Sequence, residues 1–401
     1  MSFLIFVIAF GLAILGLAAA VFLALETLAA LLPGKSNAVD AEPGPAAIVI
    51  PAHNEATTIG PTLENVKAQS AKNDTILVVA DNCTDNTAEI ARLHGADVIE
   101  RTDKDNRGKG FALQFALDHL RASPPDFVVF MDADCLFEDG ALARIIALAS
   151  SSDRPAQAIY LMKAPEGASP RLMVAEFAWS FINNVRMRGL QRLFNVTRFT
   201  GAGLAVPWDQ ISDVNLGSSE IVEDLSLTFD LARNGHPPLL AHDAIVESEF
   251  PSDEEALTRQ SARWSIGSLQ YSARKGISTV IEGLASSKPV LVGAALDLMI
   301  PPLTIFVASL CVVASIALIA WPLGAGSLPF FLSVWALILT AGSIFVGWLR
   351  FGREALPPAA MGGVFQFLIS KLAVFGEKGR QSAKQWTPTR NNAGEDEREN
   401  E

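Results

Sequence analysis

Hydrophobic residues are concentrated towards the two ends of the chain, while the middle has a mixed pattern. Residues 3–25 carry no charge, and two further uncharged runs cover residues 301–321 and 328–349. Because about 20 apolar residues cross a bilayer, each run predicts a membrane-spanning helix. A cleaved signal peptide is the alternative for the first run. That run has no positive n-region and exceeds a normal signal-peptide core, so an uncleaved anchor is favoured.

Two other apolar segments are interrupted by charge. Residues 289–300 contain Asp297, and residues 358–376 contain Lys371. A third full C-terminal crossing would export the basic residues that follow, whereas positive segments tend to remain cytoplasmic. We therefore expect interfacial or re-entrant segments here. The pattern predicts an integral inner (plasma) membrane protein with three spans, an outside N-terminus and a cytoplasmic central domain.

The middle of the chain alternates between apolar runs and helix-like stretches. Strands are predicted at 46–50, 75–80, 97–100, 126–131 and 239–248, and helices at 57–69, 85–94, 108–121, 171–193 and from near Glu220. Such alternation is typical of βαβ units, so we expect an α/β domain with a buried parallel sheet.

A mixed apolar and basic stretch follows this domain. Leu257, Trp264, Leu269 and Ile277 lie among Arg259, Arg263, Arg274 and Lys275. This pattern predicts amphipathic helices at a membrane surface. The expected organisation is an anchor at 1–33, a linker at 34–45, a catalytic domain at 46–252, interfacial helices at 253–300, a C-terminal membrane region at 301–376, and a disordered tail at 377–401.

Composition supports the membrane assignment and excludes several functions. The 401 residues are 50% hydrophobic, and the mean hydropathy of +0.30 is high for a soluble domain. A net charge of −12 without a basic patch excludes a nucleic-acid partner. The three cysteines and five histidines lack zinc-ligand spacing, so the cysteines are expected to be free thiols.

Polar residues follow the predicted strands, where α/β sheets bind their ligands. Pro51, Ala52 and Glu55 come after the first strand and could contact a nucleotide, although Asn-Glu could equally cap the next helix. Asp81 follows the second strand and could accept a hydrogen bond from a uracil-like ring. Lys109 lies among glycines that precede a helix, without Walker spacing. It could contact phosphate, or it could simply be solvated.

Asp132 and Asp134 follow the very apolar fourth strand. Two carboxylates one residue apart repel each other unless a cation or solvent screens them, so they predict a Mg²⁺ or Mn²⁺ site. Capping of a helix is the alternative.

Two later motifs add an acid pair and a basic helix face. Glu223 and Asp224 lie among apolar residues, where a carboxylate has a raised pKa and could act as a general base. A solvated helix face is the alternative. Gln260, Arg263 and Trp264 share one helix face. Arg263 could bind pyrophosphate and Trp264 a sugar or lipid, unless they form an ordinary membrane-surface pair.

Together, the motifs VVADNCTD, RGKGFAL, MDADC, TGAGLAVPW, IVEDLSL, QSARW and QWTPTR resemble the family 2 glycosyltransferases. The similarity is greatest to the membrane-anchored bacterial exopolysaccharide-assembly branch of the methanolan type, which is related to cellulose, chitin and hyaluronan synthases. It implies a GT-A fold, which is a Rossmann-like fold, with N- and C-terminal transmembrane helices.

The resemblance also implies roles for individual residues. Asp81 would bind uracil, Asp134 would coordinate the metal with help from Asp132, and Asp224 beside Glu223 would deprotonate the acceptor during inversion. Gln260, Arg263 and Trp264 would hold the donor diphosphate and acceptor. Thr200 and Gly201 of TGAG would join Trp264 at the acceptor.

The sequence departs from the family pattern in two ways. Ala80 replaces an acid of the usual second motif, and two firm C-terminal spans are too few to enclose a polymer channel. We therefore expect transfer of a single sugar from a nucleotide-sugar donor, UDP-linked in view of Asp81, to a lipid-linked glycan or lipid acceptor. The alternatives are a small processive polysaccharide synthase and a noncatalytic scaffold. Membrane lipids and a polysaccharide-assembly complex are the other expected partners.

Overall fold

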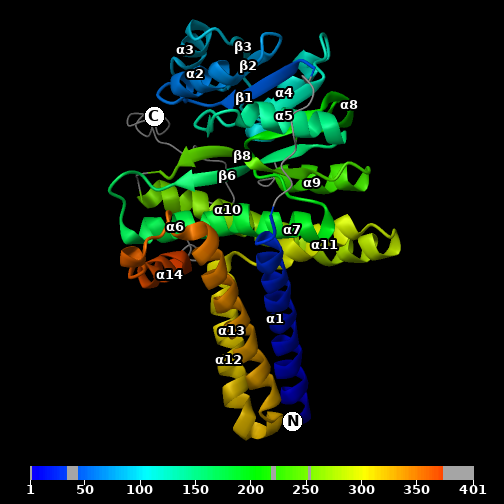
Figure 1. The fold of residues 1–401 in the computed structure, drawn as a ribbon, viewed down its shortest axis with the longest axis vertical. Coiled ribbons are helices and arrows are strands. Elements are labelled where there is room, and N and C mark those ends of the chain that lie inside the picture. The colour runs from blue at the N-terminus through cyan, green and yellow to red at the C-terminus, as the bar shows by residue number, and fades with distance from the viewer. Residues whose placement is uncertain (1, 34–43, 218–222, 252–253, 374–401) are drawn as a thin grey trace. The chain divides into compact units, whose positions relative to one another are not determined.

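The computed structural model describes residues 2–33, 44–217, 223–251 and 254–373. Two compact units divide them. We call residues 44–166 and 195–267 the sheet unit, and residues 2–33, 167–194 and 268–373 the helical unit. Figure 1 labels the elements of both units.

The sheet unit contains an eight-stranded sheet in the order β3-β2-β1-β4-β7-β6-β8-β5. The strands are β1 (Ala46–Ala52), β2 (Thr75–Asp81), β3 (Asp97–Arg101), β4 (Phe127–Phe130), β5 (Leu136–Phe137), β6 (Ala156–Lys163), β7 (Leu204–Pro207) and β8 (Leu239–Glu249). The helices of this unit are α2 (Ile59–Gln69), α3 (Thr87–Leu93), α4 (Lys109–Leu120), α5 (Ala141–Ser152), α8 (Trp208–Ile211) and α9 (Glu223–Arg233).

Four neighbouring strands form a parallel half of the sheet, as the sequence predicts, and β6 and β8 also pair in parallel. β3, β2, β1 and β4 run parallel to one another. The expectation of a wholly parallel sheet is wrong, because β7 runs antiparallel to both β4 and β6. The chain enters β7 through Gly201 and Gly203, whose φ angles of +88° and +70° turn the backbone sharply before the strand. The fold is therefore the predicted GT-A type, built on a mixed sheet.

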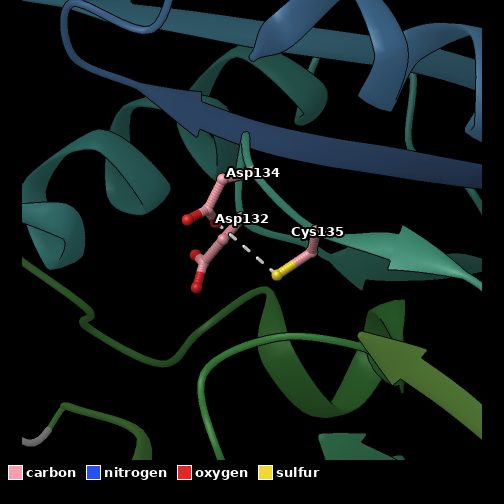
Figure 2. A group of neighbouring side chains, drawn as sticks. All are labelled: Asp132, Asp134 and Cys135. Carbon is pink, nitrogen blue, oxygen red and sulfur yellow. Dashed lines mark hydrogen bonds between the residues drawn. The ribbon is translucent and has the colours of Figure 1, made fainter. Parts of the chain in front are cut away.

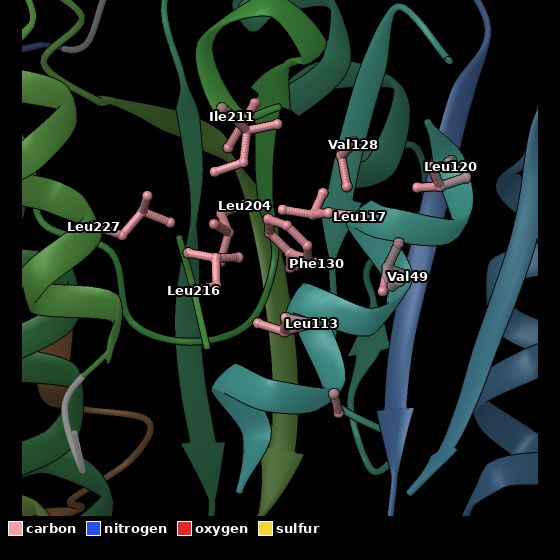
Figure 3. Packing of buried hydrophobic residues seen from close by; sticks show 14 of the residues in the cluster. Val49, Leu113, Leu117, Leu120, Val128, Phe130, Leu204, Ile211, Leu216 and Leu227 are labelled. Carbon is pink, nitrogen blue, oxygen red and sulfur yellow. The ribbon is translucent and has the colours of Figure 1, made fainter. Parts of the chain in front are cut away.

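One hydrophobic core lies between the sheet and helix α4 (Figure 3). Alternate residues of β1, such as Val49, point to the same face as Val128 and Phe130 of β4. Leu113 and Leu117 recur at helical spacing on α4 and pack against them. Since this packing fixes where the strands end, it also positions the polar residues that follow each strand.

The helical unit is built on three long apolar helices. These are α1 (Ser2–Ala30), α12 (Leu303–Ala320) and α13 (Leu328–Gly347), and they lie side by side. The candidate membrane spans are Phe3–Ala30, Leu303–Gly324 and Leu328–Gly352, each long and apolar enough to cross a bilayer. Large apolar side chains such as Phe3, Leu15 and Ile319 are exposed on them, as lipid-facing residues would be.

Shorter helices complete this unit. The predicted helix at 171–193 is a single run interrupted by a π-helical turn, comprising α6 (Pro170–Ser180), η1 (Phe181–Arg186) and α7 (Met187–Phe194). The remaining elements are α11 (Pro289–Met299), η2 (Trp321–Ala325), η3 (Trp348–Gly352), η4 (Pro358–Ala360) and α14 (Gly363–Ala373). Helix α10 (Glu254–Ala285) passes from the sheet unit into the helical unit after Gly267.

Candidate active site

Neighbouring strands deliver charged side chains to one edge of the sheet. β2 ends at Asp81, β3 ends at Arg101, and Asp132 follows β4 by two residues. These strands are parallel, so their carboxyl ends meet at the same edge. The predicted site residues are therefore assembled from separate βα turns.

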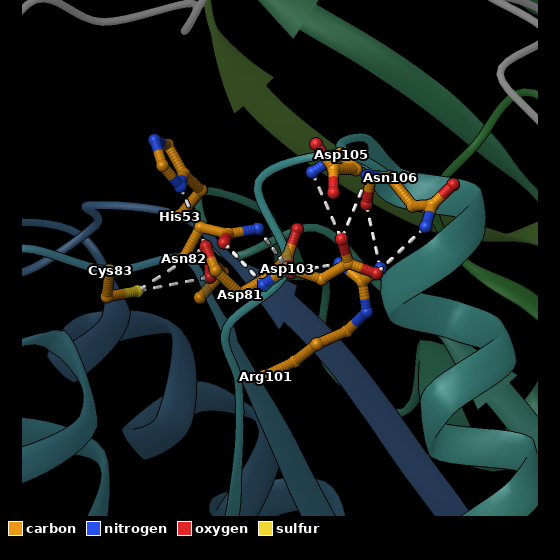
Figure 4. A network of polar contacts seen from close by, with 9 residues as sticks. His53, Asp81, Asn82, Cys83, Arg101, Asp103, Asp105 and Asn106 are labelled. Atoms are coloured by element: carbon orange, nitrogen blue, oxygen red, sulfur yellow. Dashed lines mark hydrogen bonds and ion pairs between the residues drawn. The ribbon is translucent and has the colours of Figure 1, made fainter.

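Asp81 lies in a polar network rather than alone (Figure 4). Its Oδ1 accepts hydrogen bonds from Arg101 Nη1 at 2.7 Å and from Asn82 Nδ2 at 2.9 Å. His53 Nδ1–H donates to the Asp81 carbonyl at 2.7 Å, which ties the end of β1 to the end of β2. Burial raises the pKa of Asp81, and the Arg101 guanidinium opposes this shift.

Arg101 is a site residue that the sequence analysis missed. Only about a tenth of its side chain is exposed, and besides Asp81 it binds Asp103 Oδ2 at 3.0 Å and the Asn106 carbonyl at 2.7 Å. Hydrogen bonds from Asn106 in turn lower the pKa of Asp103. The signal was available, because Arg101 ends the third parallel strand at the edge where Asp81 ends the second.

The loop after β1 leads into α2, whose N-cap residue is Thr58 and not Asn54 or Glu55. Pro51 and Ala52 are the last two residues of β1. Glu55 Oε2 accepts from Thr58 Oγ1 at 2.6 Å, and the Glu55 carbonyl accepts from the backbone of Ile59, where α2 begins. A nucleotide contact by Pro51, Ala52 or Glu55 stays a prediction.

Asp132, Asp134 and Cys135 form a compact group (Figure 2). One potential ligand atom from each lies within 4.8 Å of the others. The two carboxylates fit a hard divalent ion such as Mg²⁺ or Mn²⁺. Cys135 does not, because Mg²⁺ and Mn²⁺ prefer oxygen ligands to the soft sulfur of a thiol. Burial and the nearby aspartates also raise the pKa of this thiol well above its usual value.

Lys109 connects this acidic group to the turn before β7. Its Nζ donates to Asp132 Oδ1 and, at 2.8 Å, to the Gly201 carbonyl. Burial alone would lower the pKa of Lys109, but the carboxylates of Asp132, Glu223 and Asp224 reverse this shift and raise it. Lys109 is thus a fixed ammonium group, and the solvated alternative is wrong.

A buried amide on β6 shapes the same turn. Gln157 accepts from the Thr200 backbone N–H at 3.1 Å and donates to the Ala202 carbonyl at 2.8 Å. Gln157 is completely buried within an apolar strand. A single glutamine in such a strand does not indicate which groups it binds, so the sequence analysis missed it. The turn that presents Gly201 to Lys109 is therefore held from the core.

Glu223 and Asp224 begin the described part of α9, and Ile221 and Val222 lie outside the described residues. Burial, and next the adjacent carboxylate, raise the pKa of Glu223 to about 7. Burial likewise raises the pKa of Asp224, whose Oδ1 accepts from the Leu225 N–H at 2.8 Å. Both acids interact electrostatically with Lys109, so the acid pair belongs to the same site.

The first part of α10 contributes a second cation. Burial lowers the pKa of Arg263, and the charges of Glu223 and Asp132 oppose that shift. Trp264 is partly buried beside it. Gln260 Oε1 and Thr200 Oγ1 are buried atoms without a hydrogen-bond partner among the described residues, and a bound ligand could supply one.

Comparisons with known proteins agree with this geometry. The family model described as glycosyltransferase like family 2 matches residues 43–267. A 108-residue segment is 35% identical to the low-salt glycan biosynthesis hexosyltransferase Agl6 of Haloferax volcanii, covering 26% of this chain and 25% of the relative. A 93-residue segment is 37% identical to 4,4'-diaponeurosporenoate glycosyltransferase of Staphylococcus aureus, covering 22% and 24%. The matches thus span about a quarter of each relative's length.

Among solved structures, the fold resembles a mannosyltransferase from Pyrobaculum calidifontis that was solved with GDP-mannose and Mn²⁺. The TM-score is 0.52 at 18% identity, and the alignment covers 92% of this chain and 98% of the other. At this identity the likeness concerns the fold.

Proposed function

Because the chain belongs to glycosyltransferase family 2, we propose that it transfers a single sugar from UDP to a lipid-linked glycan or lipid acceptor, with inversion at the anomeric carbon. The proposal depends mainly on one group of charged residues, which are Lys109, Asp132, Glu223, Asp224 and Arg263. It holds two cations and three acids at the carboxyl edge of the sheet, which suits a reaction that creates a diphosphate anion and releases a proton.

The network around Asp81 supports uridine as the donor base. Uracil presents one N–H donor between two carbonyl acceptors, whereas guanine presents two adjacent donors. Asp81 Oδ1 already accepts from Arg101 and Asn82. This leaves Oδ2 as a single acceptor, with donor groups close by. That pattern suits uracil better than guanine. Competition between UDP and GDP for the purified protein tests the preference, and tighter binding of GDP would contradict it.

The two cations act on the departing diphosphate. As the acceptor oxygen bonds to the anomeric carbon, the bond from that carbon to the diphosphate oxygen breaks, and its electron pair leaves with the diphosphate. Lys109 and Arg263 can donate hydrogen bonds to the negative charge that develops. Gln260 and Trp264 on the same helix would position the diphosphate and the sugar.

The acid pair takes the proton. A carboxylate on Asp224, whose pKa burial raises, is a stronger base than an exposed aspartate and accepts the acceptor hydroxyl proton. Glu223 would tune this acid through its adjacent charge. Thr200 and Gly201, in the turn held by Gln157, would contact the acceptor.

Asp134 and Asp132 would hold a divalent cation. Mg²⁺ or Mn²⁺ bound there would neutralise charge on the diphosphate. The Mn²⁺ in the Pyrobaculum calidifontis structure supports this assignment. Removal of divalent ions with a chelator should abolish transfer and restoration should recover it, whereas transfer that persists in the chelator would exclude the role.

We also propose that the sheet unit lies on the cytoplasmic side of the inner membrane. Arg350 lies at the end of the third candidate span and Arg353 directly follows it, and positive residues favour the cytoplasm. Counting back through the other two spans puts the sheet unit on the same side. The acceptor is then reached at the membrane surface, in exopolysaccharide or cell-envelope glycan synthesis. The glycan-biosynthesis role named for the Haloferax volcanii relative supports this setting.

The decisive experiment replaces the proposed base. Asp224→Asn should lower transfer by about 10²–10⁴-fold while UDP-sugar binding is retained. Asp230→Asn is the matched control, because Asp230 lies exposed on the same helix and pairs only with Arg233 among the contacts described. Retained turnover in Asp224→Asn would sink the base assignment.

The size of the product distinguishes single-sugar transfer from processive synthesis and from a noncatalytic scaffold. Incubation of the purified protein with labelled nucleotide sugars and membrane lipids should give one labelled lipid product. A ladder of lengths would indicate a processive synthase, and no transfer from any donor would favour a scaffold.

A further inference from the structure

Lys109 and the proposed metal site depend on the same carboxylate. Lys109 Nζ donates a hydrogen bond to Asp132 Oδ1. One oxygen of Asp132 and one oxygen of Asp134 lie within 4.8 Å of each other, and Figure 2 shows the two carboxylates on the same side of the turn after β4. A cation that binds both aspartates would therefore have to share Asp132 with the ammonium group of Lys109.

The charges make this sharing unfavourable. The Lys109 ammonium offsets one of the two negative charges that the aspartates offer to a divalent cation. Like charges a few ångströms apart repel each other, and the repulsion grows where water is excluded. Only 25% of the Lys109 side chain and 31% of the Asp132 side chain are exposed, so solvent screens them incompletely. We therefore expect Lys109 to weaken the binding of a divalent cation.

A second contact allows Lys109 to leave Asp132 without leaving the site. Its Nζ also donates to the Gly201 carbonyl at 2.8 Å. The completely buried Gln157 binds the backbone on both sides of Gly201, which fixes this carbonyl in place. A lysine has a flexible four-carbon stem and three rotatable donors. The ammonium can therefore exchange Asp132 for another anion and keep its bond to Gly201.

A diphosphate is the anion that best suits this exchange. Phosphate oxygens form strong, charge-assisted hydrogen bonds with an ammonium group. They also complete the coordination of Mg²⁺, which proteins usually bind through one or two carboxylates together with substrate phosphates. The negative charge of a diphosphate would lie between Lys109 and the cation and would offset their repulsion. Both cations can then bind at the same time.

We propose that Lys109 competes with the divalent cation for Asp132 and gives up this carboxylate when the diphosphate of a nucleotide-sugar donor binds. The inference rests on the proposed function, in which Asp132 and Asp134 hold the cation. It adds a binding order to that function. The cation binds weakly alone and tightly together with the donor, and Lys109 is the residue that makes this difference.

Two affinities of the full-length protein in detergent test the proposal. Electron paramagnetic resonance measures Mn²⁺ binding without nucleotide, and calorimetry measures UDP binding at saturating Mn²⁺. In Lys109→Met, Mn²⁺ should bind at least about tenfold more tightly, because the cation no longer shares Asp132 with an ammonium group. UDP should bind at least about tenfold more weakly, because a charge-assisted hydrogen bond to phosphate is lost.

Two control variants separate competition from other effects of the substitution. Lys109→Arg keeps a positive charge at this position, so Mn²⁺ should bind no more tightly than to the wild-type protein. Lys104→Met removes an exposed lysine from the loop that precedes α4. Because solvent and salt screen an exposed charge, this variant should change neither affinity by more than about threefold.

The two changes expected in Lys109→Met have opposite signs, which a purely structural role would not produce. A fall in both affinities would show that Lys109 only holds the site together. An unchanged Mn²⁺ affinity, or equally tight Mn²⁺ binding in Lys104→Met, would show that Lys109 does not compete for Asp132. An unchanged UDP affinity would exclude the exchange with the diphosphate. Each of these results would overturn the proposal.

Failure of the proposed function would give a different result. The wild-type protein would then not bind UDP at saturating Mn²⁺. The Mn²⁺ titration uses no nucleotide, so it would still decide whether Lys109 competes for Asp132.

Discussion

A buried ion triad joins the N-terminal anchor to the rest of the helical unit, and its removal is the sharpest test of this packing. Arg186 Nη2 lies 2.6 Å from Asp297 Oδ1 and 2.6 Å from the Asp297 carbonyl, and Nε lies 3.3 Å from Glu26 Oε2. The three side chains are 4%, 1% and 0% exposed respectively. One guanidinium therefore serves two acids from two other helices, α1 and α11.

Arg186→Met removes this guanidinium and keeps an apolar chain of similar length. Breaking a buried pair by removing one partner costs about 3–5 kcal/mol, because the remaining charge stays buried without compensation. Here two acids lose the guanidinium that they share, so we expect the upper part of this range. For a unit of this size the loss corresponds to a fall in Tm of roughly 6–20 °C.

The assay is thermal unfolding of the detergent-purified, full-length protein, followed by circular dichroism. Arg274→Met is the matched control, since Arg274 is exposed in the same unit. The triple variant Arg186→Met/Glu26→Gln/Asp297→Asn should recover part of the loss, because it also removes the two buried negative charges. A fall of under 2 °C in Arg186→Met, or no difference from the control, would refute the reasoning.

Three further outcomes are expected. Burial raises the pKa of Glu223 to about 7, so a pH below 7 protonates Glu223 and removes the neighbouring negative charge that makes the proposed base, Asp224, more basic. Initial rates at saturating donor should therefore fall as pH drops below 7, and a flat profile down to pH 5.5 would contradict this. Arg101→Gln should weaken UDP binding by about tenfold in calorimetry, since Asp81 loses its guanidinium, while Arg92→Gln, which removes an exposed pair, should leave binding unchanged. Gly189→Ala should lower Tm, because a Cβ there would lie 2.1 Å from the Glu26 carbonyl oxygen; an unchanged Tm would mean that α1 and α7 do not cross so closely.

The parallel half of the sheet could be predicted because its signals are local. β1, β2 and β4 are short apolar runs that are largely buried, and Asp81 ends β2 while Asp132 lies two residues after β4. The strand-end rule then places these acids together without any knowledge of the loops. The antiparallel strand β7 could not be predicted in this way, because it has only four residues and its direction depends on the turn before it.

Partners that lie far apart in sequence were also beyond prediction. Lys109 binds Asp132, 23 residues away, and Gly201, 92 residues away. A lysine at a helix start has the same local pattern whether it is solvated or paired, so both interpretations stayed open. The role of Gln157 was still harder to predict, since its two partners lie in the turn before β7. Only the folded sheet brings these groups within hydrogen-bonding distance.

Asp297 shows how an isolated charge in an apolar segment can mislead. Its charge suggested that residues 289–300 lie at an interface, where water would solvate a carboxylate. In the structure the carboxylate is almost fully buried and lies against Arg186, 111 residues earlier in the chain. A charge can occupy an apolar helix by reaching water or by pairing, and hydropathy responds equally to both. Glu26 in the first candidate span behaves in the same way, so the acids that interrupt the apolar segments are the groups that join α1 and α11 to η1 through Arg186.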